Sequence, residues 1–381
     1  MKRWICFAVA FVLMLGVLPL GAGAAGPEVA AKSALLMDVA TGTVLYEKNA
    51  HEPLAPASVT KVMTLLLIME AIDTGVISWN DTVTASEAAA AKGGSQIFLK
   101  VGETMAVSDM VKAIAVSSAN DCACAMAEHL AGSEEAFVRR MNERAAALGM
   151  ADTRFVNCTG LDDSPEAAEH KTSAYDIALM SAQLLKNHPD IKKYTTIWMD
   201  SVRDGTFGLS NTNKMVRFYS GCTGLKTGFT SQAGYCLSAS ALREDMELVA
   251  VVMGCETSAK RFAACKSLLD YGFAGYALVD PGAPEGVVPV ELGKQERVTA
   301  VPSGAKPILL EKAQRGSVNI RVELEETVTA PVSRGQRLGT MTVTAGDQIL
   351  AQIPMVAATQ ADRLTLGELF LQTLKKAFLA K

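Results

Sequence analysis

The order of apolar and polar residues predicts a folded region in which strands flank a helical middle. Two strand-like runs, 33–38 and 43–48, are joined by turn residues and indicate a hairpin. Helical periodicity follows in five stretches: 58–74, 108–116, 121–130, 134–148 and 172–185. Strands and then a closing helix are indicated by four later stretches: 223–226, 235–242, 248–253 and 261–271. The pattern predicts an α/β fold: one antiparallel sheet built from both ends of the region, flanked by helices and a helical subdomain.

The pattern changes near Gly275. Pro281, Gly282, Pro284 and Gly286 indicate a linker. Residues 287–356 are rich in valine and turn residues and predict a small all-β domain.

Residues 361–381 predict a terminal amphipathic helix. Its apolar face consists of Leu366, Phe370, Leu374, Ala377 and Phe378, and the opposite face carries Glu368, Gln372, Lys375 and Lys376. Such a helix either docks on the β domain or lies in a membrane interface, and at this length it binds peripherally.

The first residues have the pattern of an export signal. Lys2 and Arg3 precede an apolar run over 5–20, and Ala22-Gly23-Ala24 supplies the small residues of a cleavage site. We therefore expect residues 1–24 to be a cleaved signal peptide. An uncleaved anchor is the alternative, and either outcome places the remaining chain outside the cytoplasmic membrane.

Net charge, histidine content and cysteine content limit the partners, metal sites and disulfides that the chain can have. A net charge of −4 offers no surface for a polyanion, so nucleic acid is excluded as a partner. The four histidines form no metal-binding motif, and neither metal nor cofactor is predicted. Eight cysteines become seven once Cys6 is removed with the signal, and we expect mainly buried thiols. A Cys158–Cys222 pair stays open.

Ser58 and Lys61 are a candidate nucleophile and base. Positions i and i+3 share one helix face, and Ser58 lies at the positive end of the helix dipole. Lysine accepts a proton only when neutral, which burial and a second cation favour. The motif alone is weak, because Ser303 and Lys306 repeat the spacing. Its simpler interpretation is a helix N-terminus with a solvated lysine.

Two further motifs change this assessment. Ser118-Ala119-Asn120 lies at a break between predicted helices, and Lys226-Thr227-Gly228 lies at the end of a predicted strand. A serine can relay a proton, an asparagine amide can hold a carbonyl, and Lys226 supplies the second cation. The order S-x-x-K, S-x-N, K-T-G predicts an active-site serine enzyme without a histidine base.

At these residues the chain resembles the penicillin-binding, active-site serine superfamily. Six longer stretches resemble its low-molecular-mass D-alanyl-D-alanine carboxypeptidases (peptidase family S11): GGSQIFLKVGETMAVSDMVKAIAVSSANDCACAMAEHLAG, FVNCTGLDD, HKTSAYDIALM, GCTGLKTGFTSQAGYCLSASA, VVMGCETSAKRF and LLDYGF. The resemblance covers residues 28–275 and is nearest to the sporulation-associated branch. It implies a β-lactamase/transpeptidase-like catalytic domain over 25–275, a β domain over 276–360 and the helix over 361–381.

The resemblance also implies roles for individual residues. Ser58 attacks the bond between the two D-alanines of a peptidoglycan stem peptide, Lys61 takes its proton and Ser118 returns one to the leaving group. Substrate binding is implied for six residues: Asn120, Lys226, Thr227, Gly228, Phe229 and Arg261. Penicillins acylate the same serine, and the terminal helix associates with the membrane surface. Some relatives carry histidine where this chain has Phe229, so no imidazole contribution is carried over.

Other functions share part of this chemistry. A β-lactamase uses the same three motifs, but residues 157–171 lack the glutamate-asparagine pair of class A enzymes. A D,D-endopeptidase shares all of the chemistry. A non-catalytic wall-binding protein would predict loss of the catalytic set, which is complete here.

Overall fold

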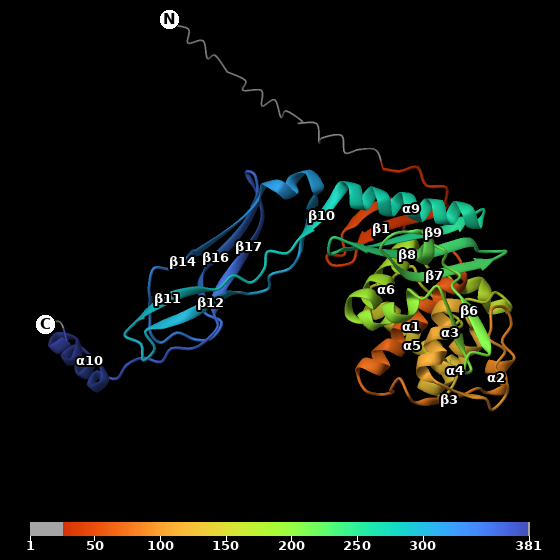
Figure 1. Ribbon diagram of the computed structural model, residues 1–381, viewed down its shortest axis with the longest axis horizontal. Coiled ribbons are helices and arrows are strands. Elements are labelled where there is room, and N and C mark those ends of the chain that lie inside the picture. The colour runs from red at the N-terminus through yellow and green to blue at the C-terminus, as the bar shows by residue number, and fades with distance from the viewer. Residues whose placement is uncertain (1–25, 380–381) are drawn as a thin grey trace, which may run out of the picture.

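The computed structural model describes residues 26–379, which form two lobes lying end to end with a terminal helix beyond them (Figure 1). The expected signal peptide, residues 1–24, lies outside this range. No helix among residues 26–379 is both long enough and apolar enough to cross a membrane.

The larger lobe contains a five-stranded antiparallel sheet in the order β2-β1-β9-β8-β7. Its strands come from the two ends of the region: β1 (Ser33–Asp38), β2 (Val44–Lys48), β7 (Cys222–Thr230), β8 (Gly234–Arg243) and β9 (Met246–Cys255). This confirms the predicted sheet. The Glu244-Asp245 turn joins β8 to β9, both residues having positive φ (47° and 65°), as a tight hairpin requires.

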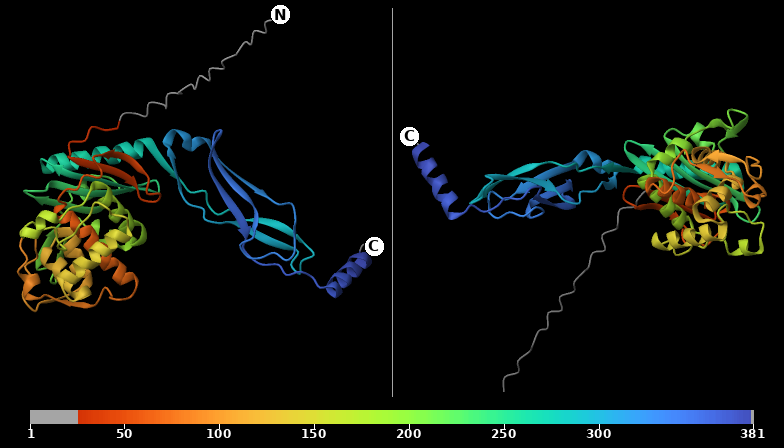
Figure 2. Two further views of the ribbon diagram at one scale, coloured as in Figure 1. Left: turned by 180° about the vertical axis from the view of Figure 1, so that it is seen from behind. Right: turned by 90° about the horizontal axis from the view of Figure 1, so that it is seen from below.

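Helices cover both faces of this sheet. Helix α9 (Ser258–Gly275) packs on one face, and α1 (Lys61–Asp73) and α6 (Ala174–Asn187) pack on the other (Figures 1 and 2). Leu35 therefore enters the core on the α1 side, and Leu36 the core under α9. Each is fully buried, worth about 1.5–3 kcal/mol of transfer free energy. Burial on both faces explains why β1 is apolar at four successive positions, 34–37.

The helical middle forms a subdomain below the sheet (Figure 1). Its predicted helices are α3 (Val107–Ser117), α4 (Asn120–Ala131) and α5 (Glu134–Ala147). Short elements that the sequence did not predict complete it: α2 (Glu87–Ala90), β3 (Thr82–Thr84), β4 (Thr104–Ala106), α7 (Lys192–Thr195), β5 (Met199–Val202) and β6 (Phe207–Ser210). A further unpredicted helix, α8 (Met215–Phe218), packs beside β7 and joins the core under α9.

Four elements have a boundary that lies three or more residues from the expected one. The α-helix begins at Lys61, after a 3-10 turn over Ala57–Thr60 that carries Ser58. Strand β7 continues to Thr230, so K-T-G lies within the strand and not at its end. Helix α9 begins at Ser258, three residues before the predicted start at Arg261, and ends at Gly275, four residues after the predicted end. Helix α10 (Leu366–Leu379) begins five residues later than predicted.

The smaller lobe is the predicted all-β domain. It has a six-stranded sheet in the order β14-β16-β17-β12-β11-β15. The strands are β11 (Gly286–Glu291), β12 (Arg297–Pro302), β14 (Val318–Leu324), β15 (Val328–Thr329), β16 (Arg337–Ala345) and β17 (Gln348–Ala357). Its separate core includes Leu338, Met341 and Met355. Helix α10 lies at the end remote from the larger lobe (Figures 1 and 2).

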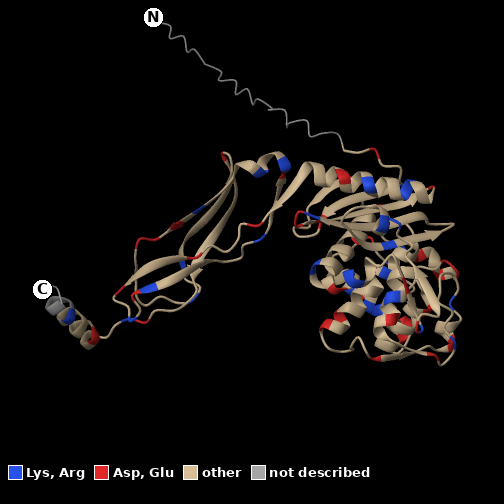
Figure 3. Ribbon diagram, in the orientation of Figure 1, with Lys and Arg blue, Asp and Glu red and all other residues tan. Residues whose placement is uncertain are grey.

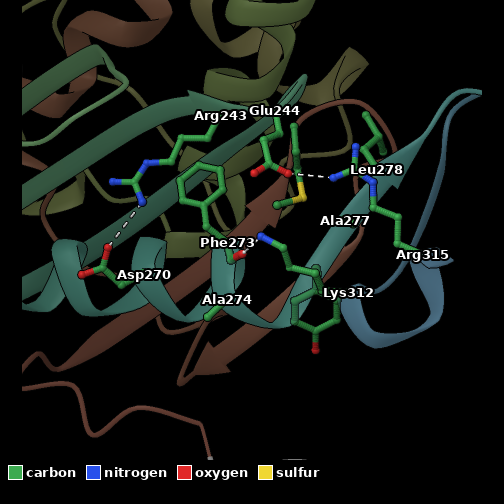
Figure 4. A pocket seen from close by; sticks show the side chains of 11 residues that line it. Arg243, Glu244, Asp270, Phe273, Ala274, Ala277, Leu278, Lys312 and Arg315 are labelled. Carbon is green, nitrogen blue, oxygen red and sulfur yellow. Dashed lines mark hydrogen bonds and ion pairs between the residues drawn. The ribbon is translucent and has the colours of Figure 1, made fainter.

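A two-stranded neck, β10 (Tyr276–Val279) paired with β13 (Ile308–Glu311), joins the lobes. A cavity of about 310 Å³ lies beside it (Figure 4). Arg315 Nη1 lies 2.7 Å from Glu244 Oε2, and Lys312 Nζ donates to Phe273 O over 3.1 Å. Both contacts tie the segment between β13 and β14 to the larger lobe, away from the predicted catalytic residues.

The structure also shows where the charged residues and the cysteines lie. Lys and Arg are interspersed with Asp and Glu over both lobes (Figure 3). The seven cysteines of the described residues are all free thiols, six of them buried. The Cys158–Cys222 pair that the sequence left open is therefore wrong. Cys158 instead hydrogen-bonds Glu134 Oε1 over 3.2 Å.

Candidate active site

Ser58 and Lys61 face each other across the turn that leads into α1. Lys61 Nζ lies 2.9 Å from Ser58 Oγ and 2.9 Å from Thr159 O, to which it donates. The Lys61 side chain has no exposed surface, although it is among the largest in the core. The lysine is therefore fixed between the hydroxyl and a backbone carbonyl.

Burial changes the acid–base state of Lys61. It lowers the pKa of the Lys61 amine to about 7, against the opposing effects of Cys158 and Asp121. An ordinary lysine is almost wholly protonated at pH 7, whereas this one is neutral in a large share of molecules. A neutral amine 2.9 Å from a hydroxyl can accept its proton.

Lys226, the second cation, is equally buried. Its pKa is lowered well below the ordinary value, first by burial and then by the charges of Lys61 and Arg261. Lys226 Nζ donates to Thr227 O over 2.9 Å. Like charges in one dry site oppose each other, so the two lysines favour a state in which at least one is neutral.

Ser118 and Asn120 occupy the break between α3 and α4. Ser118 ends α3 with a left-handed φ of 63°, and Asn120 is the first residue of α4. The Asn120 amide nitrogen Nδ2 donates to Gly93 O over 2.7 Å. In contrast, Ser118 Oγ and Asn120 Oδ1 are buried and have no hydrogen-bond partner among the described residues. Buried polar atoms without a partner are rare in folded proteins, and a catalytic role is one of the explanations for them.

Strand β7 forms the opposite wall and is an edge strand of its sheet. A Cβ atom on Gly228 would lie 2.6 Å from Pro56 O and 3.1 Å from Ser58 N, so only glycine lets the strand approach the serine turn this closely. The next residue along β7 is Phe229. Its side chain is exposed and packs on Tyr235, with ring centroids 4.3 Å apart.

Two hydrogen bonds in series connect β7, through Thr212, to the end of α3. Thr227 Oγ1 donates to Thr212 Oγ1 over 2.6 Å, and Thr212 N donates to Val116 O over 3.1 Å. The K-T-G strand and the S-x-N break are thus held in one site.

Arg261 reaches the site from α9 and lies behind the strand. Its Nη1 donates to Gly228 O over 3.0 Å and to Cys236 O over 3.4 Å, while its Nε has no partner among the described residues. The guanidinium lies 4.8 Å from the ring centroid of Phe262 and 5.3 Å from that of Tyr235. Arg261 therefore stabilises the backbone around Gly228 and adds positive charge beneath it.

Sequence reasoning missed several residues that hold the site. Asn157 Oδ1 accepts from Gly160 N over 2.6 Å and so shapes the loop that points Thr159 O at Lys61. Asp121 Oδ2 accepts from Ile97 N and Leu99 N over 3.1 and 3.0 Å and anchors the loop next to Asn120. All of these residues lie inside the stretches quoted for the family resemblance, which was the available signal.

Gly160 makes the closest backbone approach in the site, which leads to a stability prediction. At its φ of +80°, a Cβ would lie 1.8 Å from Ala57 O. We expect Gly160→Ala to lower the free energy of unfolding by about 4 kcal/mol or more. Gly132→Ala is the matched control, because φ is +82° but nothing lies within 4 Å. It should cost only the left-handed backbone term, about 1–2 kcal/mol. Urea denaturation measures both, and equal losses would contradict the close contact.

Two regions of the chain match known protein families. Residues 21–257 match the peptidase S11 family, D-alanyl-D-alanine carboxypeptidase, and residues 273–363 match the C-terminal domain of penicillin-binding protein 5. D-alanyl-D-alanine carboxypeptidase DacF of Bacillus subtilis (strain 168) is 44% identical over 334 residues, covering 86% of this chain and 85% of that protein. These matches confirm the predicted resemblance.

Solved structures share the fold. Penicillin binding protein 5 from Haemophilus influenzae has a TM-score of 0.74 at 29% identity and covers 90% of this chain and 100% of that chain. Penicillin-Binding Protein D2 from Listeria monocytogenes, solved in an ampicillin-bound form, has a TM-score of 0.56 at 31% identity and covers 64% of this chain and 98% of that chain. The chain therefore belongs to the peptidase S11 family of D-alanyl-D-alanine carboxypeptidases, a family of hydrolases, and carries the C-terminal domain of penicillin-binding protein 5.

Proposed function

We propose that the protein is a serine-type carboxypeptidase that removes the terminal D-alanine from peptidoglycan stem pentapeptides through an acyl-enzyme on Ser58. The observation that carries the proposal is the 2.9 Å contact between Ser58 Oγ and a fully buried Lys61 amine. That contact supplies a nucleophile and its base without histidine.

In the acylation step, neutral Lys61 takes the Ser58 proton while Ser58 Oγ attacks the carbonyl carbon of the penultimate D-alanine. The backbone N–H groups of Ser58 and Phe229 donate hydrogen bonds to the carbonyl oxygen, on which negative charge develops. As the peptide bond breaks, the Ser118 hydroxyl gives its proton to the nitrogen of the leaving D-alanine and takes up the proton held by Lys61, so that both residues return to their starting state. The products are free D-alanine and a peptide esterified to Ser58.

The remaining residues position the substrate. The unpartnered Asn120 Oδ1 can accept a hydrogen bond from the peptide backbone. Lys226 and Thr227 bind the terminal carboxylate, and the charge of Arg261 lies beneath it. Gly228 gives the substrate access to the edge of β7. Water then hydrolyses the ester, returning Ser58 and the shortened peptide.

Penicillins should enter the same pathway, because Ser58 attacks the lactam carbonyl just as it attacks the peptide carbonyl. The ampicillin-bound form of the Listeria relative supports this part of the proposal. Ser58 is thus the proposed nucleophile for both the peptide and the penicillin.

The test is the release of free D-alanine. Incubation with a stem pentapeptide should liberate one D-alanine per peptide, whereas a cross-linked peptide dimer should remain uncut. Cleavage of the dimer without release from the pentapeptide would replace the proposal by an endopeptidase. Hydrolysis of penicillin with many turnovers, and no release of D-alanine, would replace it by a β-lactamase.

We further propose that α10 holds the protein at the outer face of the cytoplasmic membrane. Four apolar residues of this helix are exposed: Leu366, Phe370, Leu371 and Leu374. Burying them in a lipid interface would remove this apolar surface from water. The signal-like pattern of residues 1–24 supports the same location.

Removal of residues 366–381 is expected to abolish binding to liposomes and to leave hydrolysis of soluble peptide unchanged. The deletion begins at Leu366 because the preceding residues belong to the β domain. Ala361 pairs with Val332 over 2.8 and 2.9 Å, and Leu364 N donates to Leu292 O over 2.9 Å.

Point variants separate insertion from non-specific attraction. Phe370→Asp should weaken liposome co-sedimentation, whereas Gln372→Glu, which adds a charge on the predicted polar face, should have a smaller effect. Full liposome binding by the truncated protein would refute the anchor.

A further inference from the structure

His170 is a buried histidine whose two ring nitrogens are both bound. It is 3% exposed and lies at the base of a loop that Arg154 and Lys171 close by pairing their backbones. Val156 N lies 3.3 Å from Nδ1, and Thr60 Oγ1 lies 2.8 Å from Nε2. A backbone N–H only donates, so Nδ1 accepts from Val156. In the neutral ring, Nε2 therefore carries the hydrogen and donates a hydrogen bond to Thr60 Oγ1.

Thr60 passes this contact on to the turn that carries the nucleophile. With its oxygen accepting from His170, the Thr60 hydroxyl donates to Ala57 O over 2.8 Å. Ala57 directly precedes Ser58 and has a φ of 48°, in the left-handed region that alanine rarely adopts. A strained residue keeps such a conformation only when its surroundings fix it.

We propose that His170 is a positioning residue for acylation: through Thr60 it holds the strained Ala57 turn that presents Ser58 to Lys61. The inference rests on the proposed function and deepens it. His170 touches neither the substrate nor the reacting atoms, and none of the roles implied by the three motifs includes it.

The protonation state of His170 fits this role. Burial lowers the pKa of His170 to about 4, and the charge of Lys61 acts in the same direction. Phe155 packs edge-on against the ring, with centroids 5.6 Å apart, and contributes no charge. The ring is therefore neutral near pH 7, and Nδ1 keeps its lone pair for Val156.

A simpler role would be to fill space in the core, and two substitutions separate the roles. The side-chain amide of glutamine reaches the position of Nε2, so His170→Gln keeps a donor for Thr60. The amide of asparagine reaches only the position of Nδ1, so His170→Asn keeps the acceptor for Val156 and loses the contact with Thr60.

We expect His170→Asn to lower the second-order rate constant for labelling by a fluorescent penicillin about 10- to 100-fold, and His170→Gln to recover most of that loss. The melting temperatures of both variants are measured alongside. Rates that fall in parallel with the melting temperature in both variants would overturn the proposal, because they indicate loss of packing.

A double-mutant cycle gives a second readout that packing alone would not produce. Thr60→Val removes the hydroxyl but keeps the shape of the side chain. If His170 acts through Thr60, the double variant Thr60→Val/His170→Asn labels no more slowly than the slower single variant. Additive losses would show that the two residues act separately and would reject the inference.

The control is His188→Asn. His188 is also buried, but it bonds Asp73, the last residue of α1, at the end of the helix remote from Lys61. This variant should label at the wild-type rate. Wild-type protein that neither labels nor releases D-alanine would reject the proposed function and this inference together. Normal wild-type activity with unchanged His170→Asn kinetics would reject the inference alone.

Discussion

Ser58→Ala is expected to lose all covalent labelling by a fluorescent penicillin and all release of D-alanine, while Ser303→Ala keeps both. The two serines have the same S-x-x-K spacing and differ only in structure. Ser58 lies 2.9 Å from a buried lysine amine at the start of α1. Ser303 is exposed and follows β12 outside any helix. A hydroxyl without a base beside it remains a weak nucleophile.

Gel fluorescence after denaturation measures this prediction, because only a covalent adduct survives. Mass spectrometry of the labelled peptide then identifies the serine. Persistent labelling of Ser58→Ala at the wild-type level would move the nucleophile elsewhere, and loss of labelling in Ser303→Ala would remove the distinction between the two motifs.

Lys61→Met is expected to lower the acylation rate by about 10²- to 10⁴-fold, the effect of removing a well-placed base. The Ser58 hydroxyl remains, but nothing takes its proton. Lys186→Met is the control: Lys186 also donates to a backbone carbonyl, Ala40 O at 2.6 Å, but at the surface. It should acylate at the wild-type rate. A comparable rate in Lys61→Met would mean that another group is the base.

The pH dependence follows from the same residue. Because burial lowers the pKa of Lys61 to about 7, the wild-type acylation rate should fall as the pH drops through 7 and level off above it. The folded state also binds fewer protons than the unfolded state between this pKa and the ordinary lysine value. Lys61 therefore makes the protein less stable as the pH falls through that window. Lys61→Met should lose both dependences, measured by stopped-flow labelling and by urea denaturation.

The sequence predicted the sheet because burial on both faces leaves a continuous apolar run, as in β1. It missed β3 and β4, whose three residues each are too few for periodicity to be read. It also ended β7 too early, since Gly228 and Thr230 resemble a turn in sequence but lie in the strand because the serine turn packs against Gly228.

The sequence contains a signal for the start of α10 that the periodicity argument overlooked. Thr365 and Glu368 form a capping box: Thr365 N donates to Glu368 Oε2 over 2.8 Å, and Glu368 N donates to Thr365 Oγ1 over 3.4 Å. The T-x-x-E spacing therefore marks Thr365 as the residue before the helix. Residues 361–364 instead pair with the β domain, a tertiary contact that periodicity cannot reveal.

The candidate site was predictable as far as its motifs reach. Ser58 and Lys61 could be paired because helical spacing alone brings them together. Thr159, which holds the other side of Lys61, lies 98 positions away along the chain. His170 is 110 positions from Thr60. Such contacts depend on how a loop folds back on the helix, and no local pattern encodes them.

The unpartnered oxygens of Ser118 and Asn120 carry a consequence for evolution and engineering. A buried polar atom without a partner costs about 1–3 kcal/mol, which the fold loses as long as no substrate is bound. Selection for heat resistance alone would therefore favour apolar replacements at these two positions and return a sturdier but inactive protein. Retaining both residues means accepting a weaker resting state for the sake of turnover, and a stabilised version of the protein must gain its stability elsewhere.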